Sequence, residues 1–166
     1  MAAYPARHAL YSSDEFARKC GFAESPLTEL AAFHIIFGKT VPDISLNAVA
    51  NLGYAECSFL KPVFVGDTLR SISEVIGLKQ NSNGKTGVVW VQTSGFNQRD
   101  EKVIDYIRWV MIRKSDYNSS EPTTIIPKLK PYLTVKDLII PEGLSFENYN
   151  YELSGDKYRL NDYSIG

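Results

Sequence analysis

The sequence predicts an α+β fold in which an antiparallel sheet wraps around one long buried helix. The first observation is that residues 27–37 are apolar on nearly all sides at helical spacing, which is typical of a buried helix. The second is that residues 45–114 hold four segments rich in Val, Ile, Thr, Trp and Tyr, separated by turn residues. No other segment could fill the concave face of such a sheet.

Composition excludes several classes of protein. The chain has 166 residues, 44% of them hydrophobic, which suffices for the core of one domain. Its 18 Lys and Arg against 19 Asp and Glu argue against a basic nucleic-acid surface. No apolar run reaches the roughly 18 residues of a membrane span, and residues 1–13 lack the apolar core of a secretory signal. Two cysteines make neither a disulfide framework nor a metal motif. We therefore expect a reduced, cytoplasmic protein that contacts neither nucleic acid nor membrane.

A short helix is predicted over residues 12–22. Ser12 and Glu15 have the Ser-x-x-Glu spacing of a capping box, and Gly21 lies where such a helix would end. Phe16 and Cys20 then share one face of this helix.

The buried helix follows Pro26, a residue typical of a first helical turn. Gly38 is expected to end this helix, with Pro42 as a further stop. Glu29 and His34 are its candidates for facing a pocket. For Glu29 the alternative is a capping role, because the N-terminus of a helix favours a carboxylate, and for His34 it is a hydrogen-bonded core histidine.

The four predicted strands form an antiparallel meander over residues 45–60, 67–80, 86–97 and 102–114. Asn83-Gly84 indicates a tight hairpin between the second and third strands. The last strand is apolar on both faces, so we expect the sheet to be covered on each side. A sheet around one central helix is the hot-dog arrangement. Four side chains are expected among the most buried: Phe33, Ile36, Trp90 and Trp109.

The chain changes character after Lys114. Residues 115–166 hold four of the eight prolines and much Ser, Asn and Tyr. We predict a hot-dog domain over residues 1–114 and, over 115–166, an extended connector with a short strand or turn near 132–140.

Taken alone, these residues indicate a fold and no reaction. His8, the other histidine, has no visible partner, and Cys20 and Cys57 have no nearby base that would favour a thiolate. No phosphate loop, dinucleotide fingerprint or metal-ligand cluster occurs.

Residues 51–69, NLGYAECSFLKPVFVGDTL, resemble the MaoC-like acyl-CoA dehydratase/hydratase family. In that family a strand of the form G-x-x-x-x-F-x-x-P-V-x-x-G-D-x-L follows the central helix. The resemblance covers residues 1–114. The run FGKTVPDISLNAVANLGYAECSF is similar to the N-terminal half of the double-hot-dog dehydratases, a branch that includes mesaconyl-CoA hydratase-like proteins. From this resemblance we expect the domain to lack the family's usual first strand and the connector to lead toward a second, absent half.

The resemblance implies an acyl-CoA thioester as substrate or ligand, with no cofactor and no metal. The family's catalytic Asp and His form a D-x-x-x-x-H pattern, and their positions fall on Ala6 and Tyr11. The His-Gly that usually opens the central helix is replaced by Glu29-Leu30. We therefore expect a catalytically silent half that shapes the acyl-CoA pocket, either beside a second half that carries the Asp/His pair or through self-association as a homodimer.

Two alternatives stay open. The chain could be a non-enzymatic hot-dog binding or assembly module, or a truncated gene product. It could also be an acyl-CoA thioesterase that uses Glu29 as its base, because hot-dog thioesterases often carry a carboxylate on the central helix.

Overall fold

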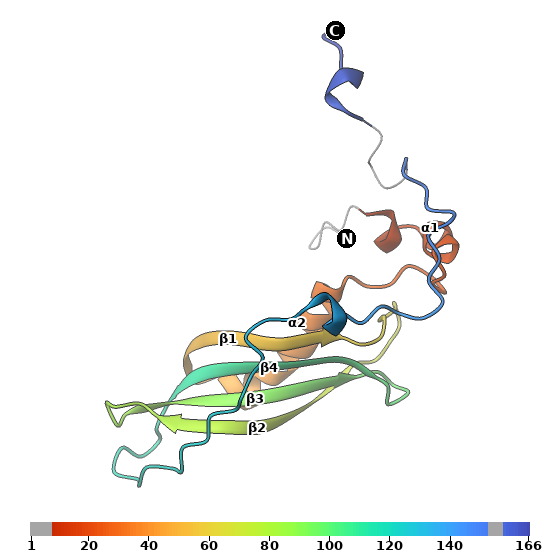
Figure 1. Ribbon diagram of the computed structural model, residues 1–166. Helices are drawn as coiled ribbons and strands as arrows, with labels where there is room; N and C mark the ends of the chain where they lie inside the picture. Colours follow the sequence, from red (N-terminus) through yellow and green to blue (C-terminus); the bar gives the residue numbers. More distant parts are fainter. Residues whose placement is uncertain (1–7, 153–157) are drawn as a thin grey trace.

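The computed structural model describes residues 8–152 and 158–166. Four antiparallel strands form one sheet, and the longest helix, α2 (Glu29–Thr40), lies along one face of it (Figure 1). The predicted α+β architecture is confirmed.

Helix α2 begins later and ends later than predicted. Thr28 caps its N-terminus by accepting the amide hydrogen of Ala31 at 3.2 Å. Gly38 does not end the helix. It is an exposed position inside it, where glycine costs only its weak helical propensity. The chain then leaves through a π-helical turn, Val41–Ser45, that contains Pro42.

Only one face of α2 is buried. Ala32, Ile36 and Thr40 lie against the sheet, while Leu30 is 64% exposed and Ile35 is 44% exposed. The prediction of a helix enclosed on all sides is therefore wrong for this chain. The apolar pattern does indicate a helix, but the chain's own sheet covers only one side of it.

Helix α1 (Asp14–Lys19) follows a short 3₁₀ turn, η1 (Ala9–Tyr11). Its N-cap is Ser13, which accepts the amide hydrogen of Phe16 at 3.2 Å, and not Ser12 as predicted. Phe16 and Cys20 do share one buried face, as expected.

The sheet order differs from a simple meander. β2, β3 and β4 are hairpin neighbours, but β1 pairs with β4, so the order is β1-β4-β3-β2. The long loop after β1 carries the chain to the opposite edge of the sheet, a step that strand periodicity does not encode. The strands are β1 (Ala48–Phe59), β2 (Arg70–Gln80), β3 (Thr86–Phe96) and β4 (Lys102–Arg113).

The core lies between α2 and the inner face of the sheet. Ile36 is fully buried, as predicted, together with Ile104 and Tyr106 of β4. Phe33, Trp90 and Trp109 are only half-buried, so these three predictions are wrong. The two tryptophans face each other across β3 and β4 on the side of the sheet away from α2, and Phe33 packs beside the half-exposed Tyr54.

That outer side is partly covered by residues 125–137, which we call the strap (Figure 1). Ile125 exchanges two backbone hydrogen bonds of 2.8 Å with Leu78 of β2, and Pro127 packs where Gly77 leaves no side chain in the way. The strap includes a 3₁₀ turn, η3 (Val135–Asp137), in the region where a short strand or turn was predicted. A last 3₁₀ turn, η4 (Leu160–Asp162), follows near the C-terminal end.

Among the described residues, no helix has the length and apolar character needed to cross a membrane.

Candidate functional site

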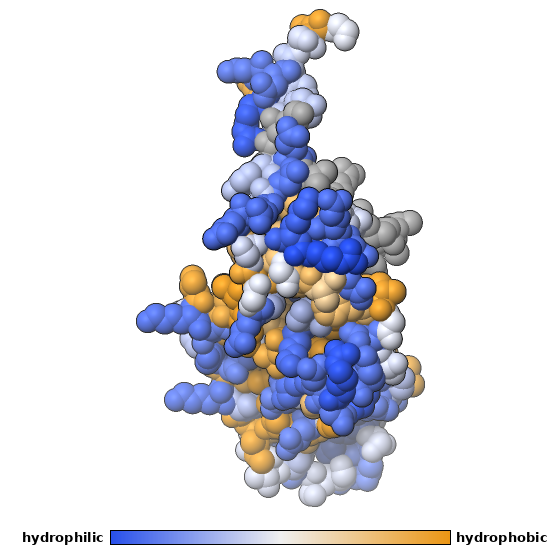
Figure 2. All heavy atoms as spheres, turned by 90° about the vertical axis from the view of Figure 1, so that its right-hand side faces the viewer, coloured by the Kyte–Doolittle hydropathy of each residue, from blue (hydrophilic) through white to orange (hydrophobic). Residues whose placement is uncertain are grey.

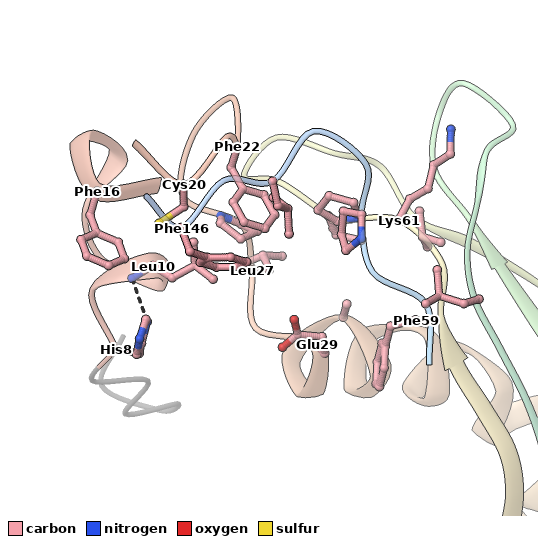
Figure 3. Close-up of a pocket in the computed structure, with 18 of the residues that line it drawn as sticks. His8, Leu10, Phe16, Cys20, Phe22, Leu27, Glu29, Phe59, Lys61 and Phe146 are labelled. Atoms are coloured by element: carbon pink, nitrogen blue, oxygen red, sulfur yellow. Dashed lines mark hydrogen bonds between the residues drawn. The ribbon is translucent and has the colours of Figure 1, made fainter. Parts of the chain in front are cut away.

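A cavity of about 250 Å³ lies where α1, the N-terminus of α2 and the end of β1 meet (Figure 3). Its walls are mostly apolar. In the space-filling view, apolar atoms gather between the part of the molecule that holds α1 and the part that holds the sheet (Figure 2). Side chains from the N-terminal segment, from α2, from the loop after β1 and from residues 139–149 all line the cavity.

Residues 139–149 cover the cavity on the side away from α2, and we call this segment the lid (Figure 3). The amide of Ser145 donates to the carbonyl oxygen of Cys20 at 3.1 Å. Gly21 has a φ of +94°, and a Cβ there would collide with the carbonyl oxygen of Gly143. Gly21 therefore lets the lid approach the end of α1.

His8 ties the lid to the N-terminal segment. Its Nδ1 accepts the amide hydrogen of Leu10 at 3.2 Å, so in the neutral ring the proton lies on Nε2. Nε2 then donates to the Tyr149 hydroxyl at 2.7 Å. The Tyr149 ring packs edge-on against Phe16, with ring centres 5.3 Å apart. Both ring nitrogens of His8 are thus engaged within the protein.

Tyr11 and Glu29 form a second polar pair beside the cavity. The Tyr11 hydroxyl donates to Oε2 of Glu29 at 2.9 Å. Burial, and then the hydrogen bond to the Glu29 carboxylate, raise the pKa of Tyr11 to about 12. At neutral pH the phenol therefore keeps its proton and cannot accept one.

The N-terminus of α2 reaches the cavity at Glu29, which lines it. Glu29 and Leu30 occupy the first two positions of the helix, and their amides have no partner among the described residues. Such amides can donate to a carbonyl oxygen that gains negative charge.

A charged group stands at the rim. Lys61 donates to Glu101 at 2.6 Å, so much of its charge is compensated. Hydrogen bonds from Asn97, Lys61 and Arg99 lower the pKa of Glu101 to about 2. In the described parts of the chain, no three His, Cys, Asp or Glu side chains are arranged as metal ligands.

The candidates named from the sequence are not all brought together. Glu29 lies in the cavity wall. His34 lies on the exposed side of α2 beside Phe33 and is not part of the wall, because the helix carries it away from the sheet. Tyr11 bonds to Glu29, and Ala6 lies outside the described residues.

Sequence reasoning missed the pair of His8 and Tyr149. These residues are 141 positions apart, and Tyr149 belongs to a segment without regular structure. No local signal in the sequence joins them.

The chain is similar to two curated enzymes. A family model described as mesaconyl-CoA hydratase matches residues 5–159. The mesaconyl-CoA hydratase of Cereibacter sphaeroides is 61% identical over 165 residues, which are 99% of this chain and 48% of that protein. The beta-methylmalyl-CoA dehydratase of Chloroflexus aurantiacus is 52% identical over 163 residues, 98% of this chain and 46% of that protein. The chain thus spans about half the length of the curated relatives it matches.

Solved structures give the same picture of the fold. A putative MaoC domain protein dehydratase from Chloroflexus aurantiacus superposes with a TM-score of 0.89 at 52% identity, over 99% of this chain and 47% of that one. A Mycobacterium tuberculosis protein described as a double hotdog fold superposes with a TM-score of 0.63 at 24% identity, over 69% of this chain and 36% of that one.

Proposed function

The chain belongs to the mesaconyl-CoA hydratase family of MaoC-like hot-dog proteins, and from this premise we propose that it holds the acyl group of an acyl-CoA thioester without itself catalysing hydration. In this proposal the chain is the silent half of an acyl-CoA hydratase or dehydratase. The reaction requires a second hot-dog unit that carries the Asp/His pair.

The hydrogen bond between Tyr11 and Glu29 carries the proposal. Hydration needs one group that takes a proton from water and one that protonates the α-carbon. In the sequence alignment the family's histidine position falls on Tyr11, and with a pKa of about 12 this phenol stays neutral. Oε2 of Glu29 accepts the hydrogen bond of Tyr11, and both nitrogens of His8 have partners within the chain. Glu29 keeps a second carboxylate oxygen, but the acid–base side chain bonded to it is the neutral Tyr11, so the described residues around the cavity offer no Asp/His pair to a water molecule.

Binding of an acyl group is what the same cavity favours. Its walls are lined by apolar side chains such as Leu27, Phe59 and Val63, which suit an acyl chain. The amide of Glu29, a residue that lines the cavity, suits a thioester carbonyl oxygen. The two curated relatives are named for mesaconyl-CoA and beta-methylmalyl-CoA, and both compounds are acyl-CoA thioesters.

The open face of the chain supports a second unit as partner. Leu30 and Ile35 are exposed on α2, and Leu52 and Tyr54 are 41% and 44% exposed on β1. β1 is an edge strand of the described sheet, and an edge strand with free backbone groups favours pairing with another strand. We propose that the unit that carries the Asp/His pair, or a second copy of this chain, covers this face.

Thiol protection tests the binding proposal directly. Cys20 lines the cavity and Cys57 does not, and both thiols are free. Butyryl-CoA at ten times its Kd should slow alkylation of Cys20 about tenfold, because only the unbound fraction reacts. Cys57 should react at an unchanged rate, and free CoA without an acyl group should protect Cys20 far less. Equal rates at Cys20 with and without butyryl-CoA would contradict the proposal.

A further inference from the structure

We propose that the lid, residues 139–149, sets the length of the acyl group that the cavity accepts, and that Tyr149 holds the lid closed through His8. This inference rests on the proposed acyl-binding function. Tyr149 is then a positioning residue, because it acts on the ligand through the lid.

The lid forms the wall opposite the N-terminus of α2 (Figure 3). With a thioester oxygen at the amide of Glu29, which lines the cavity, the acyl chain would extend into the space that the lid covers. The lid residues that line the cavity are Ile139, Pro141, Leu144, Phe146 and Tyr149. The length of chain that fits is therefore fixed by how closely the lid approaches.

The lid has fewer backbone hydrogen bonds to the rest of the chain than the strap that precedes it. The strap is held to the sheet by two backbone hydrogen bonds between Ile125 and Leu78, and by the amide of Lys130, which donates to Glu56 at 2.8 Å. The lid contains no helix or strand, and among the described residues its backbone hydrogen bond to the rest of the chain joins Ser145 to Cys20. Segments with so few backbone bonds open at low free-energy cost.

Tyr149 is the side chain that ties the lid down. Its hydroxyl accepts from His8 at 2.7 Å, and its half-buried ring packs against Phe16 and Phe146. Removal of the hydroxyl leaves the His8 Nε2–H without its partner and takes away one of the few attachments of the lid. Cys20, beneath the lid and 2% exposed, should then become easier to reach.

The chain-length profile tests the role of the lid. Affinities of the full chain for butyryl-, hexanoyl-, octanoyl- and decanoyl-CoA are measured by calorimetry. Each further buried methylene is worth roughly fourfold in affinity until the acyl chain meets the lid. Phe146→Ala should extend the gain by about two methylenes, raising the affinity for the longest ligands roughly fifteenfold relative to butyryl-CoA. Ile140→Ala is the matched control, because Ile140 lies in the same segment and does not line the cavity, whereas Phe146 does although it is 61% exposed.

The rate of Cys20 alkylation without ligand tests whether Tyr149 holds the lid closed. A hydrogen bond of ordinary net strength predicts that Tyr149→Phe speeds the reaction of Cys20 roughly fivefold. The rate at Cys57 should not change, and Tyr132→Phe, a change at an exposed strap tyrosine, should leave both rates as they are.

The two experiments separate failure of the inference from failure of the proposed function. If the unmodified chain binds no acyl-CoA, the proposed function fails, and selection by length fails with it. If it binds acyl-CoA but Phe146→Ala keeps the original profile, only the role of the lid is overturned. If the alkylation rate of Cys20 is unchanged in Tyr149→Phe, the role of Tyr149 in holding the lid closed is overturned, whether or not acyl-CoA binds.

Discussion

The contact between Ile36 and Gly95 fixes the seating of α2 on the sheet. A Cβ at Gly95 would lie 2.9 Å from both Cγ1 and Cδ1 of Ile36, and 2.6 Å from Cγ2 of Ile104. The absence of a side chain at position 95 of β3 thus lets the helix approach the sheet. One turn earlier in α2, Ala32 lines the cavity, so this seating also sets the cavity floor.

The size of the effect follows from the packing. Gly95→Ala inserts a methyl group into a filled space, which costs about 1–3 kcal/mol in the free energy of unfolding. Ile36→Ala removes a fully buried side chain and costs about 2–5 kcal/mol. In the double variant the new methyl occupies part of the space that Ile36 leaves. The combined loss should therefore be smaller than the sum of the single losses by about 1 kcal/mol.

Urea unfolding followed by tryptophan fluorescence measures this coupling, because Trp90 and Trp109 lie in the sheet. Ile35→Ala is the matched control, since Ile35 points away from the sheet and should combine additively with Gly95→Ala. If the losses in free energy of unfolding for Gly95→Ala and Ile36→Ala add to within about 0.5 kcal/mol in the double variant, the placement of α2 against β3 is refuted.

Three further predictions concern charge and assembly. Glu29→Gln should lower the pKa of Tyr11 from about 12 but leave it above 10, because burial is its largest cause; ultraviolet titration against Tyr11→Phe measures the shift. Glu101 has a folded pKa of about 2, below its unfolded value, so the free energy of unfolding should fall as the pH drops from about 4.5 to about 2, and urea titrations should show a smaller fall in Glu101→Gln. The unmodified chain should sediment as a dimer at tens of micromolar, whereas Ile35→Glu should be monomeric and Val65→Glu, a change at an exposed loop residue, should not alter the assembly. A monodisperse monomer of the unmodified chain would contradict this last prediction.

The elements of the fold could be predicted because their signals are local. Helical spacing identified α2, β-branched and aromatic residues identified the strands, and Gly84, with a φ of +64°, marked the hairpin between β2 and β3. The partner of β1 could not be predicted, since pairing with β4 depends on contacts far apart in the sequence.

Exposure was harder to predict than secondary structure. An apolar helix surface looks the same in a sequence whether its own sheet or another chain covers it. Leu30 and Ile35 therefore belong to the helix that was predicted to be buried on nearly all sides, although their side chains are exposed in this chain.

The candidate site could be predicted only in part. Its place at the N-terminus of the buried helix singled out Glu29, alignment with the family pattern singled out Tyr11, and these two residues do contact each other. The lid and the pair of His8 and Tyr149 depend on a long segment without regular structure returning to the N-terminal segment, and no periodicity or motif encodes that return.

Turnover by the purified 166-residue chain tests the central claim most directly. Crotonyl-CoA and mesaconyl-CoA are supplied, and both the loss of enoyl thioester and the release of free CoA are followed. We expect no measurable hydration by the chain alone, and hydration once a hot-dog half that carries the Asp/His pair is added. Release of free CoA that disappears in Glu29→Gln would indicate a thioesterase instead. Robust hydration by the unmodified chain alone would contradict the claim that this half is silent.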